Sequence, residues 1–274
     1  MKTLFKLLLL GLISIAAIDA DAQHSLKKLW ETDSVVAVPE SVLPVGKTLY
    51  VSEIDGEPWG RDGKAEIGKI GRDGKVIDLN WITGLNAPKG LAIRGDKLYV
   101  ADLDELVVIS ISKGKIDHKI KIDGASGLND VTVDKNGVVY VSDTQKACVF
   151  KVDHDKATML MDKLVGANGV KAVGDKLYIL TGDGMYVTDA SNKLTKICVL
   201  EHGGDGIEPI GNGDFLVTAW GGWLYYVHAD GTKDVLLDTH TTTHRTADIG
   251  YDPKTRIVYV PTFLAKSVAA YKLD

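Results

Sequence analysis

A short apolar phrase that recurs six times constrains the fold of this chain more than any other feature. The copies are Leu49-Tyr50-Val51, Leu98-Tyr99-Val100, Val139-Tyr140-Val141, Leu177-Tyr178-Ile179, Phe215-Leu216-Val217 and Val258-Tyr259-Val260. Most follow a turn rich in Gly, Asn or Asp, the residues that supply the positive φ angles of tight hairpins. The spacings of 49, 41, 38, 38 and 43 residues match one propeller blade per repeat. We therefore predict an all-β chain, a six-bladed β-propeller with four antiparallel strands in each blade.

The two ends of the chain predict how the ring closes. The last repeat provides only three strands before Leu273, and residues 27–33 ahead of the first repeat form a strand-like segment. We expect this N-terminal segment to supply the missing outer strand, which would remove an exposed sheet edge. The long first repeat contains residues 56–64 as a loop insertion. The repeated Tyr is expected to pack one blade on the next.

Residues 1–22 have the pattern of a secretory signal peptide. Lys2 and Lys6 precede an apolar run, and Ala20-Asp21-Ala22 forms a small-x-small cleavage site. We expect cleavage after Ala22, a propeller domain over residues 23–274, and a periplasmic or secreted location. No later run approaches the roughly 18 apolar residues of a membrane span, so membrane insertion is not expected.

Charge and cysteine content narrow the partners. The formal net charge is -5 and the Lys residues are scattered, so the basic stripe that follows a nucleic-acid backbone is missing. We expect a small-molecule ligand or substrate, no nucleic acid, and a monomer or weak oligomer. Cys148 and Cys198 occupy different places in successive repeats, which favours two buried free thiols over a disulfide.

Polar residues recur where each innermost strand should begin, close to the propeller axis. Reading back nine or ten residues from each phrase gives Glu40, Lys89, Asn129, Asn168, Asp205 and Asp248, with Asp130 as an alternative in the third blade. Carboxylates gathered in a narrow mouth repel one another unless a cation lies between them. Carboxylate and amide oxygens favour a hard divalent cation, Ca²⁺ first, with Mg²⁺, Mn²⁺ or Zn²⁺ as alternatives. The competing interpretation is a solvated polar channel, and Lys89 either points away from a cation or binds the anion of a ligand.

With these residues in view, the chain resembles the senescence marker protein, gluconolactonase and luciferin-regenerating enzyme family, and more distantly the paraoxonases. Members of that family bind a catalytic divalent ion through Glu, Asn and Asp residues at the places of Glu40, Asn168 and Asp205, with an Asn at the place of Asn129 nearby. Trp220 lies in an Ala-x-Trp-Gly segment like that of the family's fifth blade. The chain departs from the family at Gly127, where lactonases often carry an Arg that contacts the sugar.

The resemblance implies a hydrolase of lactones or esters. The metal would act as a Lewis acid, and Asp205 would take a proton from the attacking water. His202, His240 and His244 precede the fifth and sixth ring positions, which makes them candidates for a proton relay; His202 and His244 are the two we select. We expect Asn129, Lys89, Trp220 and Asp248 to contact the substrate. The competing function is a non-catalytic propeller that binds a carbohydrate, peptide or protein at its mouth. Its stacking surfaces would come from Trp59, Trp81, Trp220 and Trp223, and Trp59, in the insertion, is the one we expect to be exposed.

Overall fold

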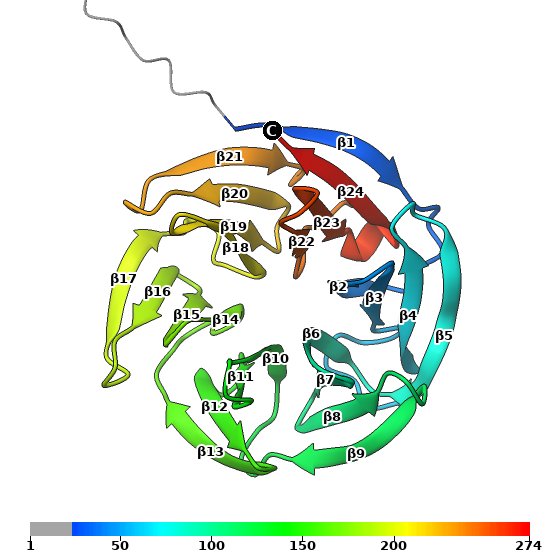
Figure 1. The fold of residues 1–274 in the computed structure, drawn as a ribbon, viewed down its shortest axis with the longest axis horizontal. Helices are drawn as coiled ribbons and strands as arrows, with labels where there is room; N and C mark the ends of the chain where they lie inside the picture. The colour runs from blue at the N-terminus through cyan, green and yellow to red at the C-terminus, as the bar shows by residue number, and fades with distance from the viewer. Residues whose placement is uncertain (1–23) are drawn as a thin grey trace, which may run out of the picture.

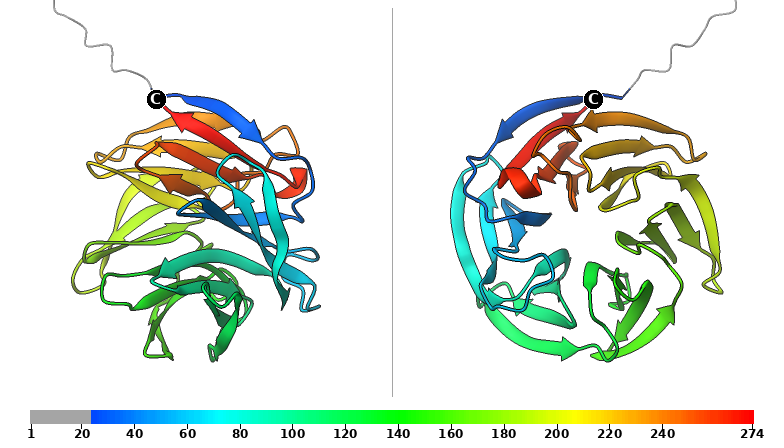
Figure 2. Two further views of the ribbon diagram at one scale, coloured as in Figure 1. Left: turned by 45° about the vertical axis from the view of Figure 1, so that its right-hand side comes forward. Right: turned by 180° about the vertical axis from the view of Figure 1, so that it is seen from behind.

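Six four-stranded antiparallel sheets surround one central axis (Figure 1). The structure is a computed structural model, and it describes residues 24–274. The predicted signal peptide, residues 1–22, lies outside the described residues. The same ring of blades is visible when the molecule is seen from behind (Figure 2). The prediction of a six-bladed propeller is confirmed.

Each of the first three blades is built from consecutive strands, numbered from the axis outward. Blade one contains β2 (Pro39–Val45), β3 (Thr48–Glu53), β4 (Ala65–Gly71) and β5 (Val76–Leu85). Blade two contains β6 (Pro88–Arg94), β7 (Lys97–Asp102), β8 (Glu105–Ser110) and β9 (Lys115–Lys121). Blade three contains β10 (Leu128–Val133), β11 (Val139–Asp143), β12 (Cys148–Asp153) and β13 (Lys156–Met161).

Blades four and five follow the same order, and blade six combines both ends of the chain. Blade four contains β14 (Val170–Val173), β15 (Lys176–Thr181), β16 (Gly184–Thr188) and β17 (Leu194–Val199). Blade five contains β18 (Ile207–Gly211), β19 (Asp214–Ala219), β20 (Trp223–Val227) and β21 (Lys233–Asp238). Blade six contains β22 (Gly250–Asp252), β23 (Ile257–Pro261), β24 (Val268–Leu273) and, outermost, β1 (Leu26–Glu31). A short 3-10 helix, η1 (Phe263–Ala265), precedes β24. Among residues 24–274 no helix has the length and apolar character needed to cross a membrane.

The N-terminal strand closes the ring as predicted. β1 pairs antiparallel with β24, and Leu26 lies opposite Leu273. Leu26 packs against the cluster of buried residues that contains Leu273 and joins blades five and six. Closure therefore combines backbone pairing with burial of apolar side chains.

The hydrophobic core lies between neighbouring blades. The repeated phrase forms the second strand of every blade, and its Tyr residues pack where the sequence predicts. Tyr50 and Tyr99 are each buried in a cluster shared with the next blade. Tyr259 is 1 % exposed and packs in the cluster between blades six and one. Burial of such aromatic side chains is a large part of the energy that holds blades together.

Cys148 and Cys198 are buried free thiols. Cys148 lies on β12 in blade three and Cys198 on β17 in blade four, in different hydrophobic clusters. Burial raises the pKa of Cys148 to about 11, so the thiol stays protonated. These side chains pack as small apolar groups, as predicted.

Glycine lets the innermost strands of neighbouring blades approach closely. A Cβ atom on Gly90 of β6 would lie 2.5 Å from Oδ1 of Asp130 on β10. A Cβ atom on Gly206, just before β18, would lie 2.8 Å from Oδ1 of Asp248. The axial channel is therefore narrow, and polar side chains from different blades are brought near one another.

Candidate functional site

The starts of the inner strands from blades one to five surround a single cavity at one end of the axis. Its volume is about 360 Å³, and its lining consists of Glu40, Pro58, Trp59, Lys89, Asn129, Thr144, Asn168, Asp205, Trp220 and Phe263. Five of the six residues predicted for the ring are in this set. A larger hollow of about 510 Å³ between blades two and three is lined by hairpin-turn residues and contains none of the six.

Three oxygen atoms of the cavity residues are buried without a hydrogen-bond partner. They are Oε2 of Glu40, Oδ1 of Asn168 and Oδ1 of Asp205. Glu40 and Asp205 are only 5 % and 2 % exposed. Because a buried polar atom without a partner costs about 1–3 kcal/mol, three such atoms in one cavity need a reason. A cation held between them would satisfy all three.

Asn129 presents a fourth oxygen, because its amide nitrogen is already bonded. Nδ2 of Asn129 donates a 2.9 Å hydrogen bond to Oγ1 of Thr144. That hydroxyl in turn donates a 2.6 Å bond to the carbonyl of Ala167. Thr144 thereby fixes the orientation of the amide. Sequence reasoning missed Thr144, which follows β11 rather than opening an inner strand.

Burial shifts the pKa values of the acidic groups at the cavity upward. Burial raises the pKa of Asp205 to about 7, although the neighbouring Asn168 side chain and Lys89 act in the opposite direction. Burial also raises the pKa of Glu40 well above its usual range, Lys89 opposes that shift, and Asp205 and Asp248 add to it. The carboxylate forms are therefore costly in this site without a cation.

Lys89 is a buried cation within the same cavity. Its side chain is largely covered, with 3 % of the residue exposed, and Nζ lies 4.4 Å from the centroid of the Trp59 ring. Among residues 24–274 no carboxylate oxygen lies within the 4.0 Å of an ion pair to this ammonium group. Burial lowers the pKa of Lys89, while Glu40, Asp205 and Asp102 raise it.

The rim of the cavity is apolar and aromatic. Trp59 is 38 % exposed and Trp220 is 45 % exposed, and both line the cavity with Pro58 and Phe263. The rings of Trp220 and Phe263 meet edge to face at a centroid distance of 5.6 Å. The Arg245 guanidinium lies 5.5 Å from the Trp220 ring. The site thus joins a polar floor to an aromatic entrance.

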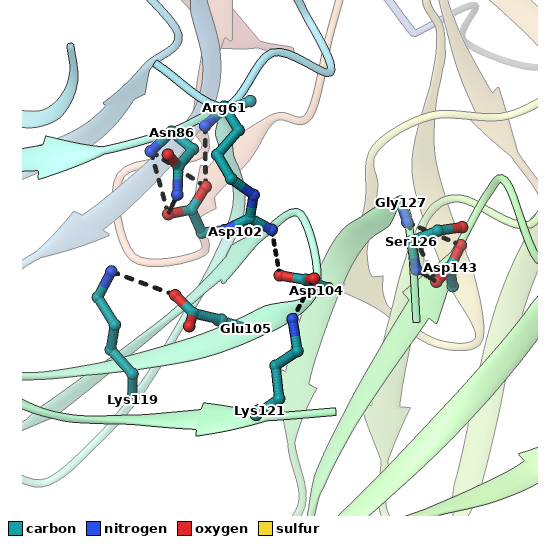
Figure 3. A network of polar contacts seen from close by, with 11 residues as sticks. Arg61, Asn86, Asp102, Asp104, Glu105, Lys119, Lys121, Ser126, Gly127 and Asp143 are labelled. Carbon is teal, nitrogen blue, oxygen red and sulfur yellow. Dashed lines mark hydrogen bonds and ion pairs between the residues drawn. The ribbon is translucent and has the colours of Figure 1, made fainter. Parts of the chain in front are cut away.

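Carboxylates at the ends of second strands position the start of the inner strands. Asp102, at the end of β7, accepts a 3.1 Å hydrogen bond from the backbone N–H of Asn86 (Figure 3). It also accepts a 2.8 Å bond from the N–H of Ala87, two residues before Lys89. Asp143, at the end of β11, accepts a 2.7 Å bond from the backbone N–H of Ser126, three residues before Asn129 (Figure 3). These hydrogen bonds fix the backbone just before Lys89 and Asn129, the polar residues that the two strands contribute to the cavity.

The blade-one insertion that carries Trp59 is tied to blade two. Arg61 donates a 2.5 Å hydrogen bond from Nη2 to Oδ1 of Asp104, and Lys121 bonds the other carboxylate oxygen of Asp104 (Figure 3). The insertion lies between β3 and β4, as predicted. This anchor holds Trp59 above Lys89.

Asp248 does not line the cavity, which corrects its assignment to the ring. Pairing across β22 and β23 gives the sixth ring position to the buried Ala247, one residue earlier. Asp248 belongs to the next layer along the channel, where its Oδ2 accepts a 2.5 Å hydrogen bond from Oγ of Ser41. Asp130 lies in this layer too and accepts a 2.7 Å bond from the N–H of Val170. Asp130, the alternative ring residue for blade three, therefore lies deeper along the channel than Asn129, which lines the cavity.

The channel layer contains its own cation. Lys171 of β14 forms a 2.9 Å ion pair with Glu208 of β18. Burial raises the pKa of Asp248 to about 7; Ser41 and Lys171 oppose that shift, and Asp205 and Glu208 add to it. Burial raises the pKa of Asp130 as well, and Asp248 adds to it. The carboxylates below the cavity are thus partly compensated by Lys171.

Neither histidine selected for a proton relay lies at the cavity. His202 stacks on the Trp223 ring at 3.7 Å between centroids, and His240 stacks on the same indole at 4.9 Å. Nε2 of His244 lies 3.0 Å from Oε1 of Glu31 on β1. The three imidazoles therefore contact Trp223 and Glu31, and none of them lines the cavity. The geometry gives the proton-relay hypothesis no support.

The donor set suits a hard cation. Two carboxylates and two amides line the cavity, and no His or Cys is among its lining residues. No cluster of three or more His, Cys, Asp or Glu residues with metal-binding geometry occurs among residues 24–274, so the amide oxygens of Asn129 and Asn168 would have to complete the ligand set of any ion bound here. Oxygen-only ligands of this kind fit Ca²⁺ better than Zn²⁺.

Comparison with known proteins supports the fold. No protein-family model matches the chain, and no curated protein sequence matches it. A solved structure provisionally described as a gluconolactonase is 14 % identical, with a TM-score of 0.71 over 92 % of this chain and 93 % of the other. A catalytically inactive virginiamycin B lyase from Staphylococcus aureus, with quinupristin, is 14 % identical, with a TM-score of 0.64 over 92 % and 100 % of the two chains. A Bacteroides thetaiotaomicron protein of unknown function is 13 % identical, with a TM-score of 0.70 over 92 % and 76 %. At these identities the likeness is one of fold.

Proposed function

We propose that this chain is a metal-dependent hydrolase that acts on a lactone or ester at the mouth of the propeller, in the periplasm or outside the cell. The observation that carries the proposal is the group of three unpartnered, buried oxygens on Glu40, Asn168 and Asp205 in one cavity. Asn129, oriented by Thr144, would supply the fourth oxygen. Ca²⁺ is the expected ion.

A divalent cation bound there would supply Lewis-acid polarisation of the substrate carbonyl. The residues of the chain would do the rest. Asn129 and Asn168 would hold the site geometry through their amide oxygens. The Asp205 carboxylate would accept a proton as a water oxygen bonds to the carbonyl carbon, and it would return that proton to the alkoxide oxygen when the ester C–O bond breaks.

The metal content of purified protein tests the first half of the proposal. Protein prepared without chelator should contain close to one Ca²⁺ per chain, and Glu40→Gln and Asp205→Asn should lose it. Asp214→Asn is a matched control, because Asp214 starts β19 at a hairpin turn far from the cavity. A parent protein with no bound ion, and no affinity for added Ca²⁺ or Mn²⁺, would contradict the metal site.

A pH-stat screen tests the second half. Sugar lactones, aliphatic lactones and aryl esters are supplied with and without Ca²⁺ or Mn²⁺, and turnover should require the ion. The Asp205→Asn variant should lose turnover by at least a hundredfold, since general-base catalysis contributes about 10²–10⁴. Turnover that persists in both the Glu40→Gln and Asp205→Asn variants would count against the mechanism.

One observation favours a second function, that of a non-catalytic ligand-binding propeller. The rim exposes Trp59 and Trp220, which line the same cavity as Phe263 and offer aromatic faces suited to stacking on a ring-shaped ligand. In this case the ion would be structural. Ligand binding that requires Ca²⁺, without any turnover across the screen, would select this alternative.

A further inference from the structure

Lys89 is a cation for which the proposed metal chemistry has no use. A buried ammonium group is costly, and proteins keep one where it is paired or where it acts on a ligand. Lys89 is 3 % exposed, lines the cavity, and has no carboxylate within ion-pair distance among the described residues. The carboxylate of Asp102, which influences Lys89, is already bonded to the backbone N–H groups of Asn86 and Ala87.

The charges in the cavity leave one positive charge in excess. Glu40 and Asp205 together carry two negative charges when ionised, and a divalent ion would neutralise both. Lys89 then remains, at the boundary between the polar floor and the aromatic rim. A ligand with a single negative charge would bring the site to neutrality.

The apolar side chains at the rim indicate what the uncharged part of that ligand is like. Trp59 covers Lys89 with a ring centroid 4.4 Å from Nζ, and Trp220 and Phe263 line the cavity as well. These side chains offer flat apolar faces to a bound ligand. The surroundings fit a compact ring attached to an anionic group.

From this arrangement we infer that the ligand is a monocarboxylate with a small apolar or aromatic ring, whose carboxylate binds Lys89 while the ring packs against the apolar rim of the cavity. The inference rests on the proposed function for the bound ion, and it names the substrate class: a cyclic ester or aryl ester that carries a free carboxylate. Neutral sugar lactones would leave Lys89 without a partner. The specificity of the site therefore depends on Lys89 and Trp59.

Binding measurements test this inference without turnover. Calorimetry on the Ca²⁺-saturated protein compares phenylacetate with phenylacetamide, which has the same shape without the charge. The parent should prefer phenylacetate by at least tenfold. Lys89→Met should lose that preference through weaker phenylacetate binding, and Lys89→Arg should retain most of it.

A matched control comes from a second Lys–Trp pair in the same chain. Nζ of Lys69 lies 3.8 Å from the Trp81 ring centroid, outside the cavity. Lys69→Met should leave the preference for phenylacetate unchanged. If Lys89→Met folds poorly, Lys89→Gln replaces it, and the melting temperature of each variant is measured first.

The outcomes separate the inference from the proposed function. A parent with no preference for the carboxylate, or a preference that survives in Lys89→Met, would overturn the inference, because the carboxylate would then bind elsewhere, for example at the ion. A preference that depends on Lys89 in a protein that binds no Ca²⁺ would leave the inference standing and overturn the metal proposal. A pair of lactones, 5-oxotetrahydrofuran-2-carboxylate and its methyl ester, extends the test to turnover, and kcat/KM should favour the free acid by at least tenfold.

Discussion

The guanidinium of Arg61 donates a 2.5 Å hydrogen bond to the carboxylate of Asp104, and this contact joins the blade-one insertion to blade two. Trp59 lies two residues before Arg61, so the contact restrains the aromatic side chain that covers Lys89. The Arg61 side chain is 53 % exposed. Exposed ion pairs stabilise a fold by only about 0–1 kcal/mol. The contact therefore matters for the position of the loop more than for folding.

We predict that Arg61→Ala weakens ligand binding several-fold while it changes the melting temperature by no more than about 2 °C. Calorimetry with phenylacetate and thermal unfolding measure the two effects. Lys135→Ala is the control, because Lys135 and Asp175 form a 2.7 Å exposed ion pair at hairpin turns away from the cavity. Equal binding by both variants would mean that the anchor does not position Trp59.

Replacement of Asn168 by Asp should lower the melting temperature in the absence of Ca²⁺ and increase the stabilisation that added Ca²⁺ gives. A third carboxylate beside Asp205 and Glu40 adds repulsion, so the variant should melt at a lower temperature than the parent in chelator. Excess Ca²⁺ should then stabilise it more than the parent. An ion at about 100 times its Kd stabilises the parent by about 2.7 kcal/mol, or roughly 5–10 °C for a chain of this size.

The control for added charge is Asn136→Asp, which places the same charge in an exposed hairpin turn. It should leave the Ca²⁺-induced shift unchanged. A shift that is equal in Asn168→Asp, Asn136→Asp and the parent would show that Asn168 does not lie at the ion.

Glu53 should make the protein less stable as the pH rises. Its carboxyl is fully buried, Oε2 accepts a 2.8 Å bond from the N–H of Ala37, and Oε1 has no partner. Burial raises the pKa of Glu53 to about 8, with Ala37 opposing the shift and Glu66 and Asp55 adding to it. Between about pH 4.5 and 8 the folded state then holds a proton that the unfolded state has released, so the stability from this group is full below that window and falls through it.

We therefore predict that Glu53→Gln reduces the loss of stability between pH 5 and pH 8 by an amount on the order of 2–3 kcal/mol. Denaturant unfolding in chelator at several pH values gives the slope of the unfolding free energy against pH. Glu57→Gln, on the exposed insertion, is the control and should keep the slope of the parent. Parallel pH profiles for the parent and Glu53→Gln would contradict the prediction.

Removal of Lys171 should destabilise the channel layer. The side chains of Lys171 and Glu208 are 27 % and 14 % exposed, and Asp130 and Asp248 lie near the same ammonium. Lys171→Met leaves these carboxylates without their cation, and we expect a loss of about 2–3 kcal/mol of unfolding free energy. The double variant Lys171→Met with Glu208→Gln should recover part of it. A loss under about 0.5 kcal/mol in the single variant would show that solvent, rather than Lys171, compensates the layer.

The architecture could be predicted from the sequence because each repeat carries its own strand pattern. The recurring phrase marks the second strand of all six blades, and the count of strands at the C-terminus anticipates the pairing of β1 with β24. Glu40, Lys89, Asn129, Asn168 and Asp205 could be placed at one cavity by counting back from the phrase.

Counting back nine or ten residues from the repeated phrase gives the wrong ring residue where the hairpin between the first two strands differs in geometry. β2, β6 and β10 contain register shifts close to the ring position, whereas β22 is only three residues long. A fixed offset therefore selects Asp248 in place of Ala247. Thr144, Phe263 and Pro58 come from other parts of the blades, and no spacing in the sequence brings them to the mouth. The stacking of His202 on Trp223 likewise depends on packing that residue order does not express.

The pairing of β1 with β24 also has a consequence for the order of folding. Leu26 and Leu273 lie opposite each other although nearly the whole chain separates them, and contacts of such long sequence separation form slowly. The cavity needs the closed ring, since Glu40 and Asp205 come from blades one and five, and blade six lies between them and contributes Phe263. An open ring would hold the two carboxylates apart. If the proposed ion binds at these oxygens, it can do so only after the two ends of the chain have met, and ion binding would then report that assembly is complete.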